Sequence, residues 1–363
     1  MKMFDRTKTK VISIGNVKIG GGNPIVVQSM TNTNTKDWKA TVRQIKQLEE
    51  VGCEIVRVSV PDMESAKNIK YIKKNIKIPL VADIHFDHRL AIESIKQGID
   101  KLRINPGNIG SKEKVMELVK EAKKAHIPIR IGVNAGSLKA VHEFSTKKDK
   151  AKALVKAAIE HVKILENCNF YDIAVSLKAS DVETTVEAYK LFAGKRNYPT
   201  HLGITEAGSI FRGTIKSSVG LGIMLAQGLG DTIRVSLTAN PVEEVKVAYQ
   251  ILQSLNLRNT GVEIISCPTC SRTKVNLIKI VNELENEIAK IKNTSNKNIK
   301  IAVMGCVVNG PGEAKEADFG IAGGIGEGLL FQKEKIICKI PEDKWVKKIV
   351  SLYKQKIKEQ QNG

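Results

Sequence analysis

The sequence has few aromatic residues, few cysteines and no long hydrophobic run. Of its 363 residues, 4% are Phe, Trp or Tyr, and six are cysteine. Six cysteines are too few for a disulfide scaffold, and they fit a reducing, cytoplasmic location. No run of about 18 apolar residues occurs, so we expect no membrane span. Residues 1–22 are basic but lack the continuous apolar stretch of a signal peptide.

The scarcity of aromatic residues also bears on the strong positive charge. The chain carries 58 Lys and Arg against 38 Asp and Glu, which gives a formal net charge of +20. Binding of single-stranded nucleic acid interleaves aromatic and basic side chains. No such cluster occurs here, so we expect no nucleic-acid partner. Most lysines follow helix-surface spacing, which is typical of a solvated face, and a polyanionic ligand is the alternative. The positions of the eleven arginines decide between these two interpretations.

Short β-branched runs alternate with helical patterns over the first two thirds of the chain. We expect strands near residues 25–31, 55–60, 79–85, 101–108, 127–134, 171–178, 200–208 and 232–238, with helices between them and a last helix at 241–255. Eight strand–helix units in about 230 residues predict an α/β fold of the (β/α)8, or TIM-barrel, type. A doubly wound open sheet is the alternative.

A polar stretch at residues 256–261 predicts a domain boundary. We expect a substrate-binding barrel domain over residues 1–258 and a smaller α+β domain over residues 259–363. The smaller domain is expected to contain strands near 262–266, 299–304, 318–322 and 335–340, and helices at 274–292 and 343–360. The glycine-rich segment 323–328 lacks the strand–GxGxxG–helix order of a phosphate loop and favours a hairpin connection.

Four predicted strands share one pattern, an arginine flanked by apolar residues. They contain Arg57, Arg103, Arg130 and Arg234. A guanidinium inside a parallel strand is costly to bury unless it has partners. Because strand side chains alternate, each arginine shares a face with a polar residue nearer the strand end, namely Ser59, Asn105, Asn134 and Ser236 respectively.

The other strands also end in polar groups. These are Asp83 and His85 on the third, Ser176 and Lys178 on the sixth, and Glu206 on the seventh. In a barrel, inward residues at the carboxyl ends of the strands surround the active-site mouth. Four arginines and Lys178 therefore predict a site for a diphosphate or polyphosphate. The alternative is a salt-bridged barrel core with Asp83 and Glu206 as counter-charges, but two carboxylates do not neutralise five cations.

Two residues are candidates for proton transfer. Glu206 lies in the segment Gly203–Gly208, and a carboxylate among cations favours its charged form, so it can act as a base before it acts as an acid. Its structural alternative is to hold Lys178 or Arg234 in place. His85 can donate a proton or bind phosphate, although a single histidine often has a structural role.

Three cysteines in turn-rich sequence predict a metal centre. Cys267 and Cys270 form a CPTC motif, and Cys306 begins a Gly/Pro loop that ends in Glu313. Two thiolates at this spacing can reach one metal centre. A structural zinc needs four Cys or His ligands, but all six histidines precede residue 202, so only Cys338 could complete the set. Three cysteines with a non-cysteine ligand favour an iron–sulfur cluster, and Glu313 is the natural fourth ligand.

At these residues the chain resembles the 4-hydroxy-3-methylbut-2-enyl diphosphate synthase family, in its short bacterial form. The resemblance runs nearly end to end through segments 27–31, 81–85, 102–108, 130–134, 202–208, 266–273 and 304–313. It implies a TIM barrel followed by a [4Fe–4S] domain. It also implies reductive opening of 2-C-methyl-D-erythritol 2,4-cyclodiphosphate to (E)-4-hydroxy-3-methylbut-2-enyl diphosphate.

The resemblance further implies roles for individual residues and partners. Cys267, Cys270, Cys306 and Glu313 would hold the cluster, and Glu206 would be the acid/base residue near the carbon skeleton of the substrate. The substrate would be bound by Arg57, His85, Arg103, Arg130, Asn134, Lys178, Arg234 and Ser236. From their places on the strands we expect Asp83 and Asn105 at the same site, with His85 as a second catalytic candidate. Electrons would come from flavodoxin or ferredoxin, and a homodimer would pair the barrel of one subunit with the cluster domain of the other. A non-redox phosphate- or pterin-binding transferase with a structural metal domain is the competing hypothesis.

Overall fold

The computed structural model describes residues 3–138, 144–258, 261–291, 298–306, 316–333 and 335–362. The chain divides into two compact units, Met1–Arg258 and Asn259–Gly363. Each unit has its own hydrophobic core. None of the helices in the described parts of the chain is long and apolar enough to cross a membrane.

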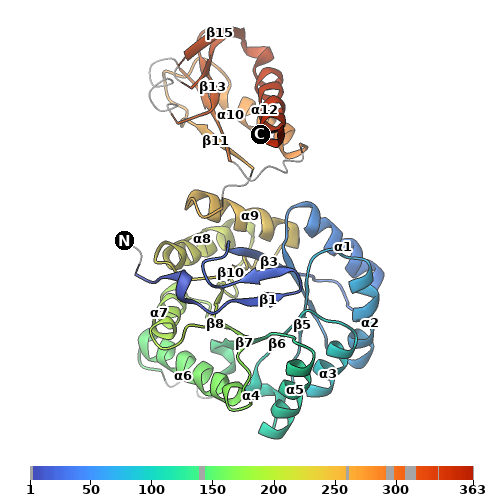
Figure 1. Ribbon diagram of the computed structural model, residues 1–363. Coiled ribbons are helices and arrows are strands. Elements are labelled where there is room, and N and C mark those ends of the chain that lie inside the picture. Colours follow the sequence, from blue (N-terminus) through green and yellow to red (C-terminus); the bar gives the residue numbers. More distant parts are fainter. Residues whose placement is uncertain are drawn as a thin grey trace. The chain divides into compact units, whose positions relative to one another are not determined.

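Eight parallel strands form the centre of the first unit (Figure 1). They are β3 (Val26–Met30), β4 (Ile55–Ser59), β5 (Leu80–Asp83), β6 (Lys101–Ile104), β7 (Ile129–Asn134), β8 (Ile173–Lys178), β9 (His201–Leu202) and β10 (Thr232–Ile233). Their order is β8-β7-β6-β5-β4-β3-β10-β9, and a parallel bridge between Val175 and Thr200 links the two outer strands. The barrel that the sequence predicts is therefore confirmed, and the open sheet is not.

Helices surround the strands on the outside of the barrel (Figure 1). They are α1 (Trp38–Glu50), α2 (Met63–Lys74), α3 (His88–Lys96), α5 (Lys112–Lys124), α6 (Lys147–Glu166), α7 (Val182–Ala193), α8 (Ile210–Ala226) and α9 (Pro241–Ser254). Several begin at an aspartate whose carboxylate accepts a backbone N–H of the first turn, as Asp37, Asp62 and Asp181 do. Apolar side chains of the helices and of the outward strand positions pack together into one core.

Three local features differ from the expected elements. The fourth expected strand, observed as β6, ends at Ile104 and not near residue 108, because Asn105 caps a short helix α4 (Pro106–Ile109) that has proline at its start. Strands β9 and β10 contain two residues each. An N-terminal hairpin, β1 (Ile12–Ile14) and β2 (Val17–Ile19), was not expected at all.

The hairpin closes the floor of the barrel. Its Ile12, Ile14 and Ile19 are buried in a small apolar cluster with residues near the starts of four barrel strands, namely Val26, Ile55, Val81 and Ala174. The hairpin therefore covers the amino-terminal end of the barrel interior with apolar side chains. Most polar inward residues lie nearer the carboxyl ends of the strands, which is where TIM barrels place their sites, whereas Lys101 is the buried first residue of β6.

The second unit is an α+β domain. Its sheet has the order β11-β12-β13-β14-β15, with the elements β11 (Val262–Ser266), β12 (Ile299–Met304), β13 (Phe319–Gly323), β14 (Glu327–Gln332) and β15 (Lys335–Pro341). The first three strands are parallel and the last two pairings are antiparallel. Helices α10 (Leu277–Ala289) and α12 (Trp345–Asn362) supply apolar side chains to its main core. The hairpin at residues 323–328 is confirmed, and β14 was missed.

Candidate active site

The register of the barrel strands places the predicted polar residues opposite one another on neighbouring strands. Met30 lies opposite Arg57, Ser59 opposite Asp83, and Arg103 lies opposite both Asp83 and Arg130 on its two neighbours. Residues between them in sequence, such as Val56, Val58 and Ala82, belong to the outer core against the helices. Alternation along the strands therefore directs the arginines into the barrel.

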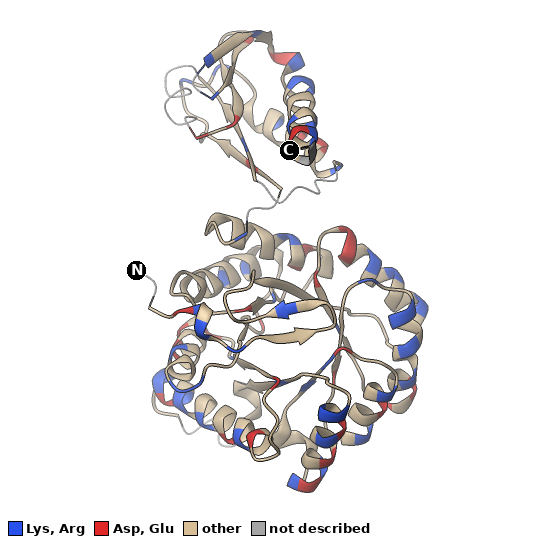
Figure 2. Ribbon diagram, viewed as in Figure 1, with Lys and Arg blue, Asp and Glu red and all other residues tan. Residues whose placement is uncertain are grey.

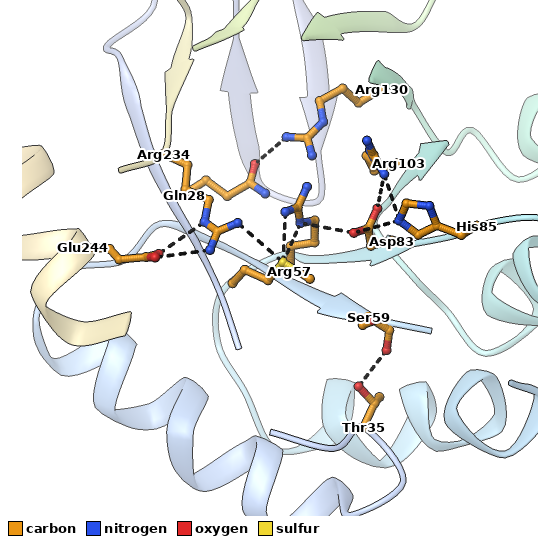
Figure 3. A network of polar contacts seen from close by, with 11 residues as sticks. Gln28, Thr35, Arg57, Ser59, Asp83, His85, Arg103, Arg130, Arg234 and Glu244 are labelled. Carbon is orange, nitrogen blue, oxygen red and sulfur yellow. Dashed lines mark hydrogen bonds and ion pairs between the residues drawn. The ribbon is translucent and has the colours of Figure 1, made fainter. Parts of the chain in front are cut away.

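Asp83 is the centre of one polar network (Figure 3). Its Oδ1 accepts a hydrogen bond from Arg103 Nη1 at 3.0 Å, and its Oδ2 lies 3.8 Å from Arg57 Nε and 3.5 Å from His85 Nε2. Arg103 Nη1 is also 3.0 Å from His85 Nε2. Burial alone raises the pKa of Asp83, but Arg57, His85 and Arg103 outweigh it and hold that pKa well below its usual range. Burial lowers the pKa of Arg57 to about 10 against the pull of Asp83.

Arg234 belongs to a second network. Its Nε and Nη2 each donate to the carboxylate of Glu244 at 3.2 Å, and its Nη1 is 3.6 Å from the sulfur of Met30. Glu244 lies in the first turn of α9 and is buried. The carboxylate that pairs with Arg234 is therefore Glu244, and not Glu206 as the salt-bridge interpretation of the sequence supposed.

Three further cations are buried in the barrel with few partners. Arg130 Nη1 donates to Gln28 Oε1 at 3.5 Å, while Arg130 Nε and Lys101 Nζ have no hydrogen-bond partner among the described residues. Burial, together with neighbouring arginines, lowers the pKa values of Arg130, Lys101 and Lys178 well below their usual ranges. An anionic ligand would oppose this shift, because a nearby negative charge favours the charged form of each side chain.

Two glycines make room for these long side chains. A Cβ at Gly132 would lie 2.6 Å from Arg103 Nε, and a Cβ at Gly203 would lie 2.7 Å from Lys178 Nζ. Any larger residue at either position would therefore collide with a cation of the site. Neither glycine has a positive φ, so close approach rather than backbone conformation requires them.

The remaining predicted residues lie at the carboxyl ends of the strands without joining the two networks. Asn105 caps α4 by accepting the Gly107 N–H at 3.2 Å, and its amide donates to Ser137 at 3.3 Å. Asn134 and Ser236 are half-buried. Glu206 is exposed, follows β9, and has a φ of 54°. Its carboxylate makes no hydrogen bond or ion pair with the described residues.

The charge balance at the mouth of the barrel favours an anionic ligand. Six cations, namely Arg57, Lys101, Arg103, Arg130, Lys178 and Arg234, share the interior with two carboxylates that pair with them, Asp83 and Glu244. Buried N–H donors of Gln28, Arg103 and Arg130 have no acceptor among the described residues. Buried donors without acceptors are uncommon in folded proteins, so this arrangement calls for an acceptor-rich ligand such as a diphosphate.

The cysteines of the second unit are placed by its parallel strands. Cys267 follows the end of β11 and Cys306 comes two residues after the end of the neighbouring β12. The Gly305 N–H donates to Cys267 Sγ at 3.3 Å, and the backbone N–H of Arg272 lowers the pKa of Cys270. N–H groups directed at thiolates are typical of iron–sulfur ligands.

The structure does not assemble the complete ligand set. Within the residues described, no group of three or more His, Cys, Asp or Glu is close enough to hold a metal ion, and Glu313 lies outside those residues. Cys267, Cys270 and Cys306 are all free thiols. Their chemistry and their position after adjacent strands fit a thiolate-bound cluster.

Sequence reasoning missed four residues of the barrel interior. They are Gln28, Met30, Lys101 and Glu244. Strand alternation alone would have found Gln28 and Met30 on the inward face of β3, and Lys101 two residues before Arg103. Glu244 gave no comparable signal, because an acidic first turn is typical of any solvent-exposed helix.

The fold and the site together define a class of protein. It is a TIM barrel with a strongly cationic mouth, joined to an α+β domain with three free cysteines at its strand ends. Models of the GcpE TIM-barrel domain and of the GcpE protein C-terminal domain match residues 9–249 and 263–355. The chain belongs to the GcpE family.

Individual relatives agree with this assignment. The chain is 56% identical over 347 residues to 4-hydroxy-3-methylbut-2-en-1-yl diphosphate synthase (flavodoxin) of Clostridium acetobutylicum, covering 96% of this chain and 98% of the relative. It is 57% identical over 348 residues to the protein of the same name from Thermodesulfovibrio yellowstonii, covering 96% and 99%.

Solved structures share the barrel. Dihydropteroate synthase from Stenotrophomonas maltophilia matches with a TM-score of 0.52 at 12% identity, covering 68% of this chain and 98% of that one. At such low identity the likeness shows the fold alone.

Proposed function

We propose that this protein reductively opens 2-C-methyl-D-erythritol 2,4-cyclodiphosphate to (E)-4-hydroxy-3-methylbut-2-enyl diphosphate, in the methylerythritol phosphate route to isoprenoids. Relatives that align over nearly their whole length carry the name of this synthase, which favours it over the transferase alternative. The observation that carries the proposal is the excess of buried and partly buried cations in the barrel. Six cations face two paired carboxylates there, and a diphosphate supplies the missing negative charge.

The barrel residues bind and orient the substrate in this proposal. The diphosphate is bound by Arg57, Arg103, Arg130, Lys178 and Arg234, with Asp83 holding two of the arginines and with Asn105, Asn134 and Ser236 at the rim. Guanidinium groups that are already in place stabilise charge on the departing oxygens without reorganising. His85, beside Arg103 and Asp83, and the exposed Glu206 are the proton-transfer candidates.

A [4Fe–4S] cluster supplies the electrons and a Lewis-acidic iron when it is bound. We assign it to Cys267, Cys270, Cys306 and Glu313. Support comes from the free thiols at the ends of the adjacent strands β11 and β12 and from the N–H group directed at Cys267. A cluster with one carboxylate ligand suits chemistry at the metal better than simple electron storage.

An acidic electron carrier, flavodoxin or ferredoxin, is the proposed redox partner. The relatives' names specify flavodoxin. The formal charge of +20 would accelerate encounter with an acidic protein. Figure 2 shows Lys and Arg positions, in blue, repeated along the outer helices of the barrel. A reducing, cytoplasmic location follows from such a partner and from six free cysteines.

We also propose a homodimer in which the barrel of one subunit works with the cluster domain of the other. An exposed apolar row along α8 supports association through the barrel. Ile210, Phe211, Ile215, Val219 and Ile223 are between 40% and 75% exposed there. Single exposed apolar residues are ordinary, but a row along one helix marks an interaction face. Analytical ultracentrifugation of Phe211→Glu should show a shift from dimer to monomer, and a monomeric wild type would refute the proposal.

Anaerobic turnover tests the proposed function. The protein is loaded with iron and sulfide, mixed with the cyclic diphosphate and reduced methyl viologen, and assayed for product by mass spectrometry. Product should form only when both the cluster and the reductant are present. A full, reducible cluster without product would show that the substrate is wrong. Product formed without a cluster would show that the redox assignment is wrong.

A further inference from the structure

A buried carboxylate on an outer helix holds one of the site arginines. Glu244 of α9 is 3% exposed. Its Oε2 accepts a hydrogen bond from Arg234 Nε at 3.2 Å, and its Oε1 accepts one from Arg234 Nη2 at 3.2 Å. This two-point contact fixes the plane of the guanidinium as well as its position.

The carboxylate is itself held from two sides. Ser29 Oγ of β3 donates to Glu244 Oε2 at 3.0 Å, and the backbone N–H of Leu237, which follows β10, donates to Oε1 at 3.1 Å. Each oxygen of Glu244 therefore accepts one bond from Arg234 and one from the barrel wall. Because both donors belong to the barrel, the carboxylate cannot follow Arg234 if that side chain rotates.

Of the three guanidinium nitrogens of Arg234, Nη1 is the one that takes no part in this pairing, and both of its N–H groups remain for a ligand. That nitrogen, Nη1, is 3.6 Å from Met30 Sδ, and the same sulfur is 2.9 Å from Nη2 and 3.1 Å from Nε of Arg57. Figure 3 shows the contacts from the two arginines meeting at this sulfur. A thioether is a weak acceptor, so these N–H groups keep most of their capacity for a stronger one.

We propose that Glu244 is a positioning residue that directs Nη1 of Arg234 toward Arg57, so that both guanidinium groups bind one phosphate group of the substrate above Met30. The proposal rests on the diphosphate site of the proposed function. Without Glu244, Arg234 would be repelled by the cations around it and would lose its fixed orientation. The phosphate group would then be bound by Arg57 alone, without the second contact from Arg234.

A purely structural role for Glu244 makes a different prediction. If Glu244 only neutralised a buried charge, its loss would weaken the whole site, whether or not residue 234 is an arginine. If it acts through Arg234, its loss should have no further effect once Arg234 is gone. A double-mutant cycle on substrate affinity separates the two roles.

The cycle compares wild type, Glu244→Gln, Arg234→Met and the double variant, each with intact cluster absorbance. The matched control is Glu243→Gln, since the neighbouring Glu243 is more exposed and pairs with Lys246. Calorimetric titration measures the Kd for the cyclic diphosphate and, separately, for inorganic pyrophosphate. Thermal unfolding of each variant checks the fold, and the double variant avoids leaving a buried carboxylate alone.

The expected pattern is an affinity loss of about tenfold for Glu244→Gln. Arg234→Met should lose more, the double variant should match Arg234→Met, and Glu243→Gln should match wild type. Turnover of Glu244→Gln should show a raised KM with little change in kcat. Equal affinity of Glu244→Gln and wild type would overturn the proposal, and so would losses that multiply in the double variant.

The two titrants separate this proposal from the assigned reaction. If the wild type binds pyrophosphate but not the cyclic diphosphate, the proposed substrate is wrong. The double-mutant cycle measured with pyrophosphate would still test the role of Glu244. A wild type that binds neither ligand would refute both the diphosphate site and the role of Glu244.

Discussion

Asp83 Oδ1 accepts a hydrogen bond from Arg103 Nη1 at 3.0 Å, across the neighbouring strands β5 and β6. The same carboxylate is 3.8 Å from Arg57 Nε on β4. One buried carboxylate therefore spaces two guanidinium groups before any ligand binds. Preorganised cations of this kind bind a diphosphate without the cost of bringing like charges together.

Replacing Asp83 with asparagine should destabilise the protein. Removing one partner of a buried ion pair leaves charge uncompensated, which costs about 3–5 kcal/mol. The pKa of Asp83 is lowered in the folded state, so its contribution is present above roughly pH 4 and is lost as the pH falls below that value. Denaturant unfolding of both proteins at neutral and acidic pH measures this. If the difference in unfolding free energy between wild type and Asp83→Asn were the same at acidic as at neutral pH, the ion-pair account would be contradicted.

Arg130→Ala should weaken binding of the cyclic diphosphate by about 10- to 100-fold while the cluster content stays normal. Arg130 is buried, and Gln28 is its one side-chain hydrogen-bond partner among the described residues. Arg89→Ala is the control, because Arg89 is exposed and pairs with Asp87 on the surface. Unchanged affinity in Arg130→Ala would remove that arginine from the site.

Substrate binding should take up a proton at Lys178. Burial and the neighbouring Arg130, Arg57, Arg234 and Arg103 lower the pKa of this lysine in the free protein, and a bound diphosphate raises it again. Affinity should therefore fall as the pH rises between the free and bound pKa values, by about tenfold per pH unit for one proton. Calorimetry in two buffers of different ionisation enthalpy counts the protons. Lys178→Met should abolish the uptake; uptake that persists in this variant would assign the proton elsewhere.

Glu206→Gln should lower kcat by about 100-fold and leave KM nearly unchanged. Glu206 is exposed and holds no arginine in place, so its loss should not disturb the cation networks. Glu183→Gln, at an exposed carboxylate of α7 that pairs with Lys147, is the control. Full turnover by Glu206→Gln would exclude it from proton transfer.

Cys306→Ser should lose both the brown colour of the cluster and turnover, whereas Cys338→Ser should keep both. Cys338 is exposed on β15 and provides a matched thiol. Absorbance, iron content and product formation are measured side by side. Loss of metal in both variants would instead support a four-cysteine site of the kind that zinc prefers.

The barrel was predictable from the sequence because strand patterns and helix patterns alternate regularly along the first two thirds of the chain. Parallel strands are buried on both faces, so they appear in the sequence as short, nearly continuous apolar runs. Such runs predict Ile55–Ser59 and Ile129–Asn134 as strands. The predicted end of β6 is wrong because Asn105 caps a helix that begins at Pro106, so the chain turns into a helix where the sequence pattern predicts more strand. The two-residue strands β9 and β10 are too short for any period to define their limits.

The arginines of the site were predictable for the same reason, while their partners were not. Alternation directs Arg57 and Arg103 inward and therefore predicts that they meet. Glu244 reaches Arg234 only because α9 packs against β3 and the segment that follows β10, and this tertiary contact has no local signal in the sequence. The roles of Asn105 and Glu206 in binding and catalysis stay predictions.

The stoichiometry of electrons to product tests the central claim most directly. Opening of the cyclic diphosphate with loss of water consumes two electrons and two protons. Under anaerobic conditions, about two molecules of the one-electron donor methyl viologen should therefore be oxidised for each hydroxybutenyl diphosphate formed. Product formed without oxidation of the donor, or donor oxidation without product, would contradict the reductive opening proposed for this protein.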